Sequence, residues 1–174
     1  MKEIRFFVDG EAKPAGSKVG YAIPDKKRPG KQRVIITDQT KQAGKNWRSD
    51  VRAAAKTKLS KNHTPLEGPL YLVVHFYFSR PKSHYRTGKN AHLLKDSAPE
   101  YHVGRPDMTK LLRAIEDALN NFVWKDDSQI VRQWAFKDYD QIPGALVRIG
   151  RFPYEKKIAH INSLIAKYDK QEGE

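Results

Sequence analysis

Apolar residues recur along this chain with two different spacings, and together these predict a mixed α/β domain of the α+β type. Short apolar runs at residues 4–8, 33–37, 70–78, 130–136 and 144–149 predict strands. Apolar residues at helical spacing predict helices over 41–59, from 106 or 107 to 119, and over 153–170. We see neither an internal repeat nor a second domain, so we expect residues 1–174 to form one domain with a mixed sheet packed against helices.

The run from Leu70 to Phe78 is the most continuously apolar in the chain. Such a run is typical of a central strand that is buried on both faces, and His75 within it is expected to be a core histidine. We expect the strand at 144–149 to pair antiparallel with the strand at 130–136. The apolar stripe of the helix over 153–170 is expected to pack against either the sheet or a second subunit.

The helix over 41–59 has an apolar face and a basic face. The apolar face predicted to meet the core consists of Trp47, Val51, Ala54, Ala55 and Leu59, and the outer face of Lys45, Arg48, Arg52, Lys56 and Lys58. A basic helix face is explained equally well by solvation and by contact with DNA.

Two irregular regions carry many basic residues. The Pro-, Gly- and Lys-rich region at 13–31 predicts loops or a loose hairpin, which either embraces DNA or is a plain surface excursion. A long loop runs from Ser79 to Arg105, and its basic and aromatic residues suit phosphate contacts and base stacking. The candidate DNA-binding residues are Lys13, Lys18, Arg80, Lys82, Arg86 and Lys110.

The charge is placed unevenly. The chain of 174 residues has a net charge of +13, and residues 1–62 form a basic N-terminal part with 16 Lys or Arg against 6 Asp or Glu. Residues 107–140 carry 5 against 7. A basic flank beside an acidic centre favours a polyanionic partner such as DNA, although basic surfaces also serve solubility alone.

The sequence contains neither cysteine nor a long apolar run, and this excludes several classes of protein. Without cysteine the chain forms neither a disulfide scaffold nor a thiolate metal site. It has no apolar run of the roughly 20 residues that a membrane span needs, and no signal-peptide pattern at its start. We therefore expect a cytoplasmic protein that makes no contact with membranes.

The acidic residues of the centre lie on and just after the helix that begins at Asp107. Thr109, Arg113 and Glu116 share one face of that helix, and Asp126 and Asp127 lie in the turn behind it. Carboxylates are ligands for Mg²⁺, and Arg113 is placed to pair with a phosphate. Plain structural roles explain the same residues: a helix cap for Asp107, solvated charge for Glu116 and turn chemistry for Asp126 and Asp127.

The motifs from Gly104 to Arg132 resemble the signature of the RusA-type Holliday junction resolvases. The motifs are Arg105-Pro106-Asp107, Leu111-Leu112, Asp117-Ala118-Leu119-Asn120 and Trp124-Lys125-Asp126-Asp127-Ser128-Gln129-Ile130-Val131. The resemblance implies a metal-dependent endodeoxyribonuclease of bacteriophage or prophage origin that uses Mg²⁺, or alternatively Mn²⁺. It also implies a RusA-like fold and a homodimer whose two sites nick opposite strands of a four-way DNA junction symmetrically during recombination and repair.

Carried over by position, the resemblance implies that Asp107 is the first catalytic acid and Asp127, with Asp126 beside it, the later acid. Arg113 stands where the family has a catalytic lysine. The second carboxylate of the family's Asp-x-Asp-Asn is missing, because Thr109 occupies its place. Either the site is weakened or another acid serves, and Glu116 is the expected substitute, so that Asp107, Glu116 and Asp127 would hold the metal.

Three other functions compete with junction cleavage. A junction-binding or branched-DNA-binding protein that has lost catalysis is favoured by Thr109. A less selective nuclease for branched or single-stranded DNA fits the same residues. A metal-free protein that reads duplex sequence fits poorly, because the chain lacks a helix-turn-helix pattern.

Overall fold

The computed structural model describes residues 3–16, 18–38 and 42–152, and it has the α+β architecture that the sequence predicts. The strands are β1 (Ile4–Asp9), β2 (Lys18–Pro24), β3 (Gln32–Asp38), β4 (Leu70–Phe78), β5 (Ile130–Tyr139) and β6 (Gly144–Arg151). The helices are α1 (Gln42–Lys56) and α2 (Met108–Leu119), with short 3-10 turns at Lys82–His84, Gly88–Asn90 and Asp127–Gln129. The predicted helix over 153–170 lies outside the described residues.

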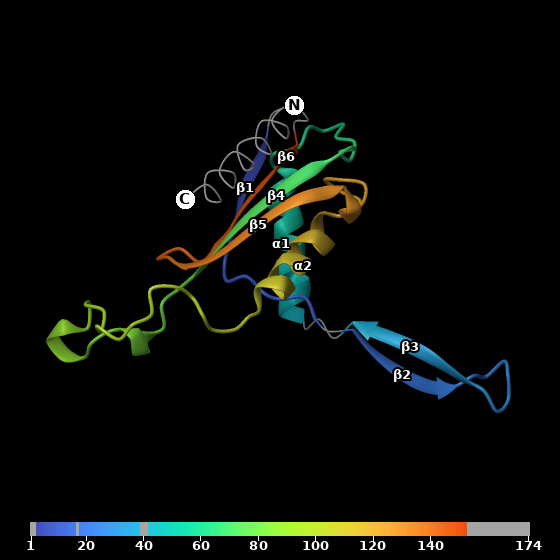
Figure 1. Cartoon of the computed structure of the whole chain (residues 1–174), viewed down its shortest axis with the longest axis horizontal. Coiled ribbons are helices and arrows are strands. Elements are labelled where there is room, and N and C mark those ends of the chain that lie inside the picture. The colour runs from blue at the N-terminus through green and yellow to red at the C-terminus, as the bar shows by residue number, and fades with distance from the viewer. Residues whose placement is uncertain (1–2, 17, 39–41, 153–174) are drawn as a thin grey trace, which may run out of the picture.

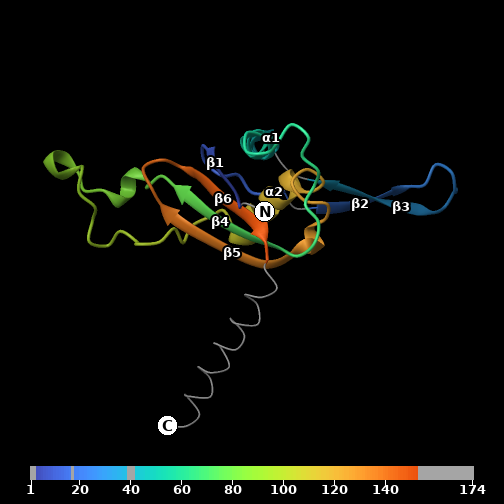
Figure 2. The same ribbon diagram turned by 90° about the horizontal axis from the view of Figure 1, so that it is seen from above.

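Four strands form the main sheet, in the order β1-β6-β4-β5 (Figure 1). Strands β4 and β5 are parallel, whereas β6 runs antiparallel to both β4 and β1. Both helices cover the same face of this sheet (Figure 2). Alternate residues of β1, β4 and β6 point toward the helices and form the core with the apolar faces of α1 and α2.

Strand β4 is an interior strand of the sheet, as predicted, but the prediction that it is buried on both faces is wrong. Burial alternates along it, so that Leu72, Val74 and Phe76 are fully buried while the residues between them are only half-buried. His75 belongs to the half-buried set, and its ring stacks on Phe136 of β5 with 4.3 Å between centroids. The helices cover one face of β4, and His75 lies on the other.

The predicted pairing of the last two strands is also wrong. Strand β4 lies between β5 and β6 and pairs with each of them. An interior position stabilises the most apolar strand more than any other, because both of its edges and one complete face are removed from water there. The short connection from Tyr139 to Gly144 spans two strand spacings, about 10 Å, which its length easily allows.

Helix α1 ends at Lys56, three residues before the predicted end, and buries Trp47, Val51 and Ala55 as expected. It packs against α2, and Arg48 on its basic face pairs with Asp117 of α2 at 3.1 Å. None of the helices in the described part of the chain has the length and apolar character needed to span a bilayer.

Two segments project from opposite sides of this body (Figures 1 and 2). The first is the β2–β3 hairpin, in which the region predicted at 13–31 to form loops or a loose hairpin supplies β2 and the turn, and the strand predicted at 33–37 supplies β3. Its side chains are mostly in water, and Val34 and Ile36 are each 68% exposed. The second is the long loop between β4 and α2, where Tyr85 and Leu94 form an isolated bridge.

Candidate active site

Helix α2 presents the predicted acidic residues along its length and at both of its ends. Its apolar stripe, which includes Leu111, Ile115 and Leu119, is buried against the sheet and α1. Thr109 and Arg113 are exposed and Glu116 is half-buried, so the predicted polar face is confirmed. Asn120 ends the helix, and Asn121 follows with a φ of 56°, a left-handed conformation that asparagine tolerates.

Asp107 is the N-cap residue of α2, but its side chain makes no capping hydrogen bond. Its backbone carbonyl accepts from Lys110 N and Leu111 N, both at 3.1 Å, and starts the helix. The carboxylate is 57% exposed and lies 3.4 Å from Lys110 Nζ. A carboxylate at a helix start that is open to water and makes no cap hydrogen bond retains lone pairs for a ligand.

The segment before Asp107 is fixed by Lys137 of β5. Its ammonium group donates to the carbonyls of Gly104 at 2.6 Å and Pro106 at 2.8 Å. Burial lowers the pKa of Lys137, while the nearby carboxylate of Asp107 opposes that shift. Lys137 was not predicted to be a positioning residue, although a polar residue at an inward-facing position of a strand was a usable signal.

Glu116 lies between α2 and β5, two turns beyond Thr109. Gln133 Nε2 donates to Glu116 Oε1 at 2.6 Å. Burial raises the pKa of Glu116; the bond from Gln133 opposes this shift, and the carboxylates of Asp127 and Asp117 raise the pKa further. Glu116 therefore belongs electrostatically with the acids at the carboxyl end of α2.

Asp127 lies in the turn after α2, and both of its carboxylate oxygens accept hydrogen bonds. Trp124 Nε1 donates to Oδ1 at 2.8 Å, and Asn120 Nδ2 donates to Oδ2 at 3.0 Å. The indole belongs to a fully buried tryptophan. Asp127 thus has a structural role in connecting the end of α2 to the turn, whatever else it does.

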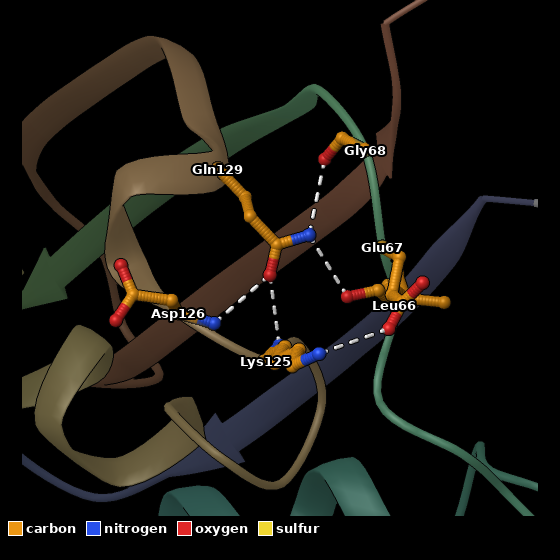
Figure 3. A network of polar contacts seen from close by, with 6 residues as sticks. All are labelled: Leu66, Glu67, Gly68, Lys125, Asp126 and Gln129. Atoms are coloured by element: carbon orange, nitrogen blue, oxygen red, sulfur yellow. Dashed lines mark hydrogen bonds and ion pairs between the residues drawn. The ribbon is translucent and has the colours of Figure 1, made fainter.

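Asp126 caps the same turn in a reciprocal arrangement with Gln129. Its Oδ1 accepts from Ser128 N at 2.9 Å, and hydrogen bonds with Ser128 lower the pKa of Asp126. The Gln129 side-chain oxygen accepts from the backbone of Asp126 and of Lys125, both at 2.9 Å, and its nitrogen donates to the carbonyls of Leu66 and Gly68 (Figure 3). This network fixes the turn to the segment that leads into β4.

The structure does not bring the three predicted metal ligands together. Asp107 precedes α2 and Asp127 bonds to Asn120 beyond its last turn, so the 12 residues of the helix, about 18 Å along its axis, lie between the two positions. Within the described residues no group of three or more His, Asp or Glu side chains is arranged to hold a metal ion. The expected site of Asp107, Glu116 and Asp127 is therefore not formed within a single chain.

The candidate DNA-binding residues have different surroundings. Lys82 and Lys110 are exposed, Lys13 pairs with Glu11 at 2.8 Å, and Lys18 begins β2. Two arginines are used inside the long loop. Arg80 donates to the carbonyls of Pro99 and Glu100 and lies over the Tyr139 ring, and Arg86 bonds to Leu94 and Asp96. Both arginines thus hold the loop in shape.

Comparison with known proteins gives two matches. A family model described as "Endodeoxyribonuclease RusA" matches residues 21–150, which is most of the chain. A protein of Bacillus subtilis (strain 168), "Uncharacterized protein YqaN", is 29% identical over 119 residues, covering 60% of this chain and 81% of its own length. The family match includes α2, the turn after it and the long loop.

Proposed function

Because the chain belongs to the RusA family of endodeoxyribonucleases, we propose that it cleaves Holliday junctions with the help of a divalent metal ion. The observation that carries this proposal is the family match across α2, together with the open carboxylate of Asp107 at the start of that helix. The substrate is four-way or related branched DNA, which is nicked symmetrically in recombination and repair. We further propose that the protein is of phage or prophage origin and acts in the bacterial cytoplasm, where this DNA lies.

The residues present fit a smaller metal site than the three-carboxylate set. Mg²⁺ often takes only one or two carboxylates from the protein and completes its shell with waters and substrate phosphate oxygens. Asp107 provides such a carboxylate, and we propose that it holds Mg²⁺, or Mn²⁺, against the DNA. The ion would supply charge neutralisation for hydrolysis of the phosphodiester.

The remaining roles belong to the basic residues beside Asp107. Lys110, one helical turn away, and Arg113, a further turn along, present cations to a phosphate that approaches the start of α2. Lys137 keeps the preceding segment in place through two carbonyl hydrogen bonds. Arg113 replaces the family's lysine and adds a planar donor set, which suits bidentate contact with phosphate.

Glu116, Asp126 and Asp127 form a second acidic group at the other end of α2. We propose that the chain forms a homodimer, that the carboxyl end of α2 in one subunit lies near the amino end of α2 in its partner, and that these acids contribute to cleavage only there. What supports this is the length of α2, about 18 Å along its axis, which lies between Asp107 and the Asn120 to which Asp127 bonds.

A second candidate function is junction binding without cleavage. Thr109 at the place of a family carboxylate favours it, as does the lack of a three-ligand cluster among the described residues. A labelled four-way junction incubated with the protein and Mg²⁺ distinguishes the two, with EDTA as the control. Nicking that depends on Mg²⁺ supports the nuclease, whereas a bound but intact junction supports the binding protein. Flap, duplex and single-stranded substrates at the same salt concentration test junction selectivity.

A further inference from the structure

The β2–β3 hairpin starts beside the proposed reaction centre. Ala15 is buried, and its backbone N donates to the carbonyl of Lys110, in the first turn of α2, at 2.9 Å. Strand β2 begins three residues later, at Lys18. From this attachment the hairpin extends away from the four-stranded sheet (Figures 1 and 2). The root of the hairpin and the amino end of α2 therefore lie next to each other.

The tip of the hairpin, residues 24–33, is strongly basic. It carries five Lys or Arg against one Asp. The carboxylate of that acid, Asp25, is only 8% exposed; it accepts from Lys27 N at 2.9 Å and pairs with Arg28 Nε at 2.7 Å. Asp25 thus shapes the turn and adds little negative charge to its surface. The exposed cations of the tip are Lys26, Lys27, Arg28, Lys31 and Arg33.

One face of the hairpin is apolar and uncovered. The pairing of the strands places Ile36 opposite Gly20 and Val34 opposite Ala22, so these four residues share a face. Val34 and Ile36 are each 68% exposed. Adjacent apolar residues in water on a projecting element are typical of an interaction surface. Because a two-stranded ribbon also has little stability of its own, a partner that covers this face would stabilise it.

The charge of the hairpin favours a nucleic acid as this partner. Residues 18–38 carry six Lys or Arg against two Asp. Two copies of so basic a hairpin repel each other, whereas DNA phosphates attract it. The major groove of a duplex, about 12 Å wide, admits a two-stranded β-ribbon, and apolar side chains contact thymine methyl groups there. A DNA duplex thus complements both the basic tip and the apolar face.

The length of the hairpin sets how far along a duplex it reaches. Each of its strands has seven residues, which span about 20 Å. Successive phosphates of one DNA strand lie about 3.4 Å apart along the duplex axis. The tip therefore lies about six base pairs or more from the root, where the proposed metal site is.

We infer that the β2–β3 hairpin lies along one duplex arm of the junction and that Lys26, Lys27 and Lys31 contact phosphates of that arm. Val34 and Ile36 meet the groove of the same arm. The inference rests on the proposed function, because it takes branched DNA to be bound with a phosphate at Asp107. The hairpin contributes to the binding of DNA and takes no part in the chemistry of cleavage.

The double variant Lys26→Ala/Lys27→Ala tests the tip. Junction binding is titrated in EDTA at several salt concentrations, so that the result does not depend on cleavage. Each lost phosphate contact reduces the slope of log K against log salt by about 0.9, so the slope should fall by about 1.8. Lys61→Ala/Lys125→Ala is the matched control, because it removes two exposed lysines beyond the carboxyl ends of α1 and α2. Equal falls in both variants would reflect net charge alone and refute the contact.

The double variant Val34→Thr/Ile36→Thr tests the apolar face and keeps the β-branched side chains that suit a strand. It should weaken junction binding about tenfold at every salt concentration, with an unchanged slope, because apolar contacts release no counterions. Sedimentation without DNA tests a second copy of the chain as the partner. If the unmodified protein is dimeric and this variant is monomeric, the hairpin pairs with another subunit and the inference is wrong.

Methylphosphonate linkages locate the contact on the DNA, because each removes the charge of a single phosphate. They are placed one at a time along an arm of the junction. We expect weaker binding from a linkage about six base pairs or more from the branch point, and no such loss with Lys26→Ala/Lys27→Ala. A loss of the same size with this variant refutes the contact between the tip and that phosphate.

The outcomes separate this inference from the proposed function. Junction cleavage that depends on Mg²⁺, with the same salt slope in the tip variant and the unmodified protein, refutes the hairpin contact and leaves the nuclease proposal intact. Hairpin contacts on a junction that stays intact with Mg²⁺ refute the nuclease and leave the contact standing. A protein that does not bind the junction at all refutes both.

Discussion

The two ends of α2 carry the same kind of side chain in opposite situations. At the amino end, the carboxylate of Asp107 makes no capping bond and is 57% exposed. At the carboxyl end, both oxygens of Asp127 accept hydrogen bonds, one of them from a fully buried tryptophan. The hydrogen bonds thus distinguish an aspartate whose carboxylate is open to water from one whose carboxylate also stabilises the fold.

The largest effect is expected from Asp107→Asn. Removing the charge at the proposed metal site should lower junction cleavage about 1000-fold, equivalent to about 4 kcal/mol of transition-state stabilisation. The melting temperature should hardly change, because the side chain makes no cap bond. Single-turnover cleavage and thermal melting measure the two effects, and Asp96→Asn, at an exposed loop position, is the control. Cleavage at the normal rate by folded Asp107→Asn contradicts the assignment.

Mixing two inactive variants tests whether the ends of α2 act together across a dimer. If Asp107 of one subunit works with Asp127 of its partner, a mixture of Asp107→Asn and Asp127→Asn forms mixed dimers with one intact site. We then expect nicking of one strand for each mixed dimer, although each variant alone is inactive. Co-refolded mixtures and single-strand nicking assays measure this. No recovery in proven mixed dimers means that the two acids do not form a site shared between subunits.

Asp127→Leu should reduce stability far more than any change at Asp107. It leaves Trp124 Nε1 and Asn120 Nδ2 without their acceptor, and each such loss costs about 1–3 kcal/mol. Urea unfolding followed by tryptophan fluorescence gives the free energy of unfolding. Asp126→Asn, which keeps an acceptor for Ser128 N, is the matched control with an unchanged midpoint. Equal stability of Asp127→Leu and the unmodified protein would show that the hydrogen bonds contribute nothing.

Glu116→Gln should change how stability depends on pH. The pKa of Glu116 is raised in the folded protein above its ordinary value of 4.5, chiefly by burial. The folded state therefore favours the protonated acid, and this contribution to stability is present below pH 4.5 and lost as the pH rises through the folded value. The glutamine variant keeps an acceptor for Gln133 but does not ionise. The melting temperature of the variant minus that of the unmodified protein should increase from pH 4 to 7. If the two melting temperatures instead change in parallel with pH, the pKa of Glu116 is not raised in the folded protein.

The smallest effect is expected from Lys110→Ala at the amino end. Loss of one phosphate contact should weaken junction binding a few-fold and reduce the slope of log K against log salt by about 0.9. Binding titrations in EDTA at several salt concentrations measure the slope. Lys125→Ala serves as the comparison. Lys125 is an exposed lysine beyond the carboxyl end of α2, and it pairs with Glu67. Equal slopes for the two variants would remove Lys110 from the DNA contact.

Local patterns predicted much of this molecule. The apolar spacing of α2, its start at Asp107 and the turn at Asp126 and Asp127 are all set by neighbouring residues, and all were anticipated. The pairing of β6 with β4 was not, because strand order depends on competition between distant segments. The position of Asp127 relative to Asp107 could not be predicted for a similar reason. Strand β5 does return toward the start of α2, but Asp127 precedes that strand, so the residue that arrives beside Pro106 is Lys137.

The β2–β3 hairpin is expected to unfold locally, before the four-stranded sheet does. Seven residue pairs join its two strands, and neither edge has a third strand among the described residues. A two-stranded ribbon in water has little stability of its own. Its amide protons should therefore exchange with solvent through local opening, whereas those of β4 should exchange only when the whole sheet unfolds. A protease that cuts at the turn near Arg28 would then sever the ribbon and leave the four-stranded body folded.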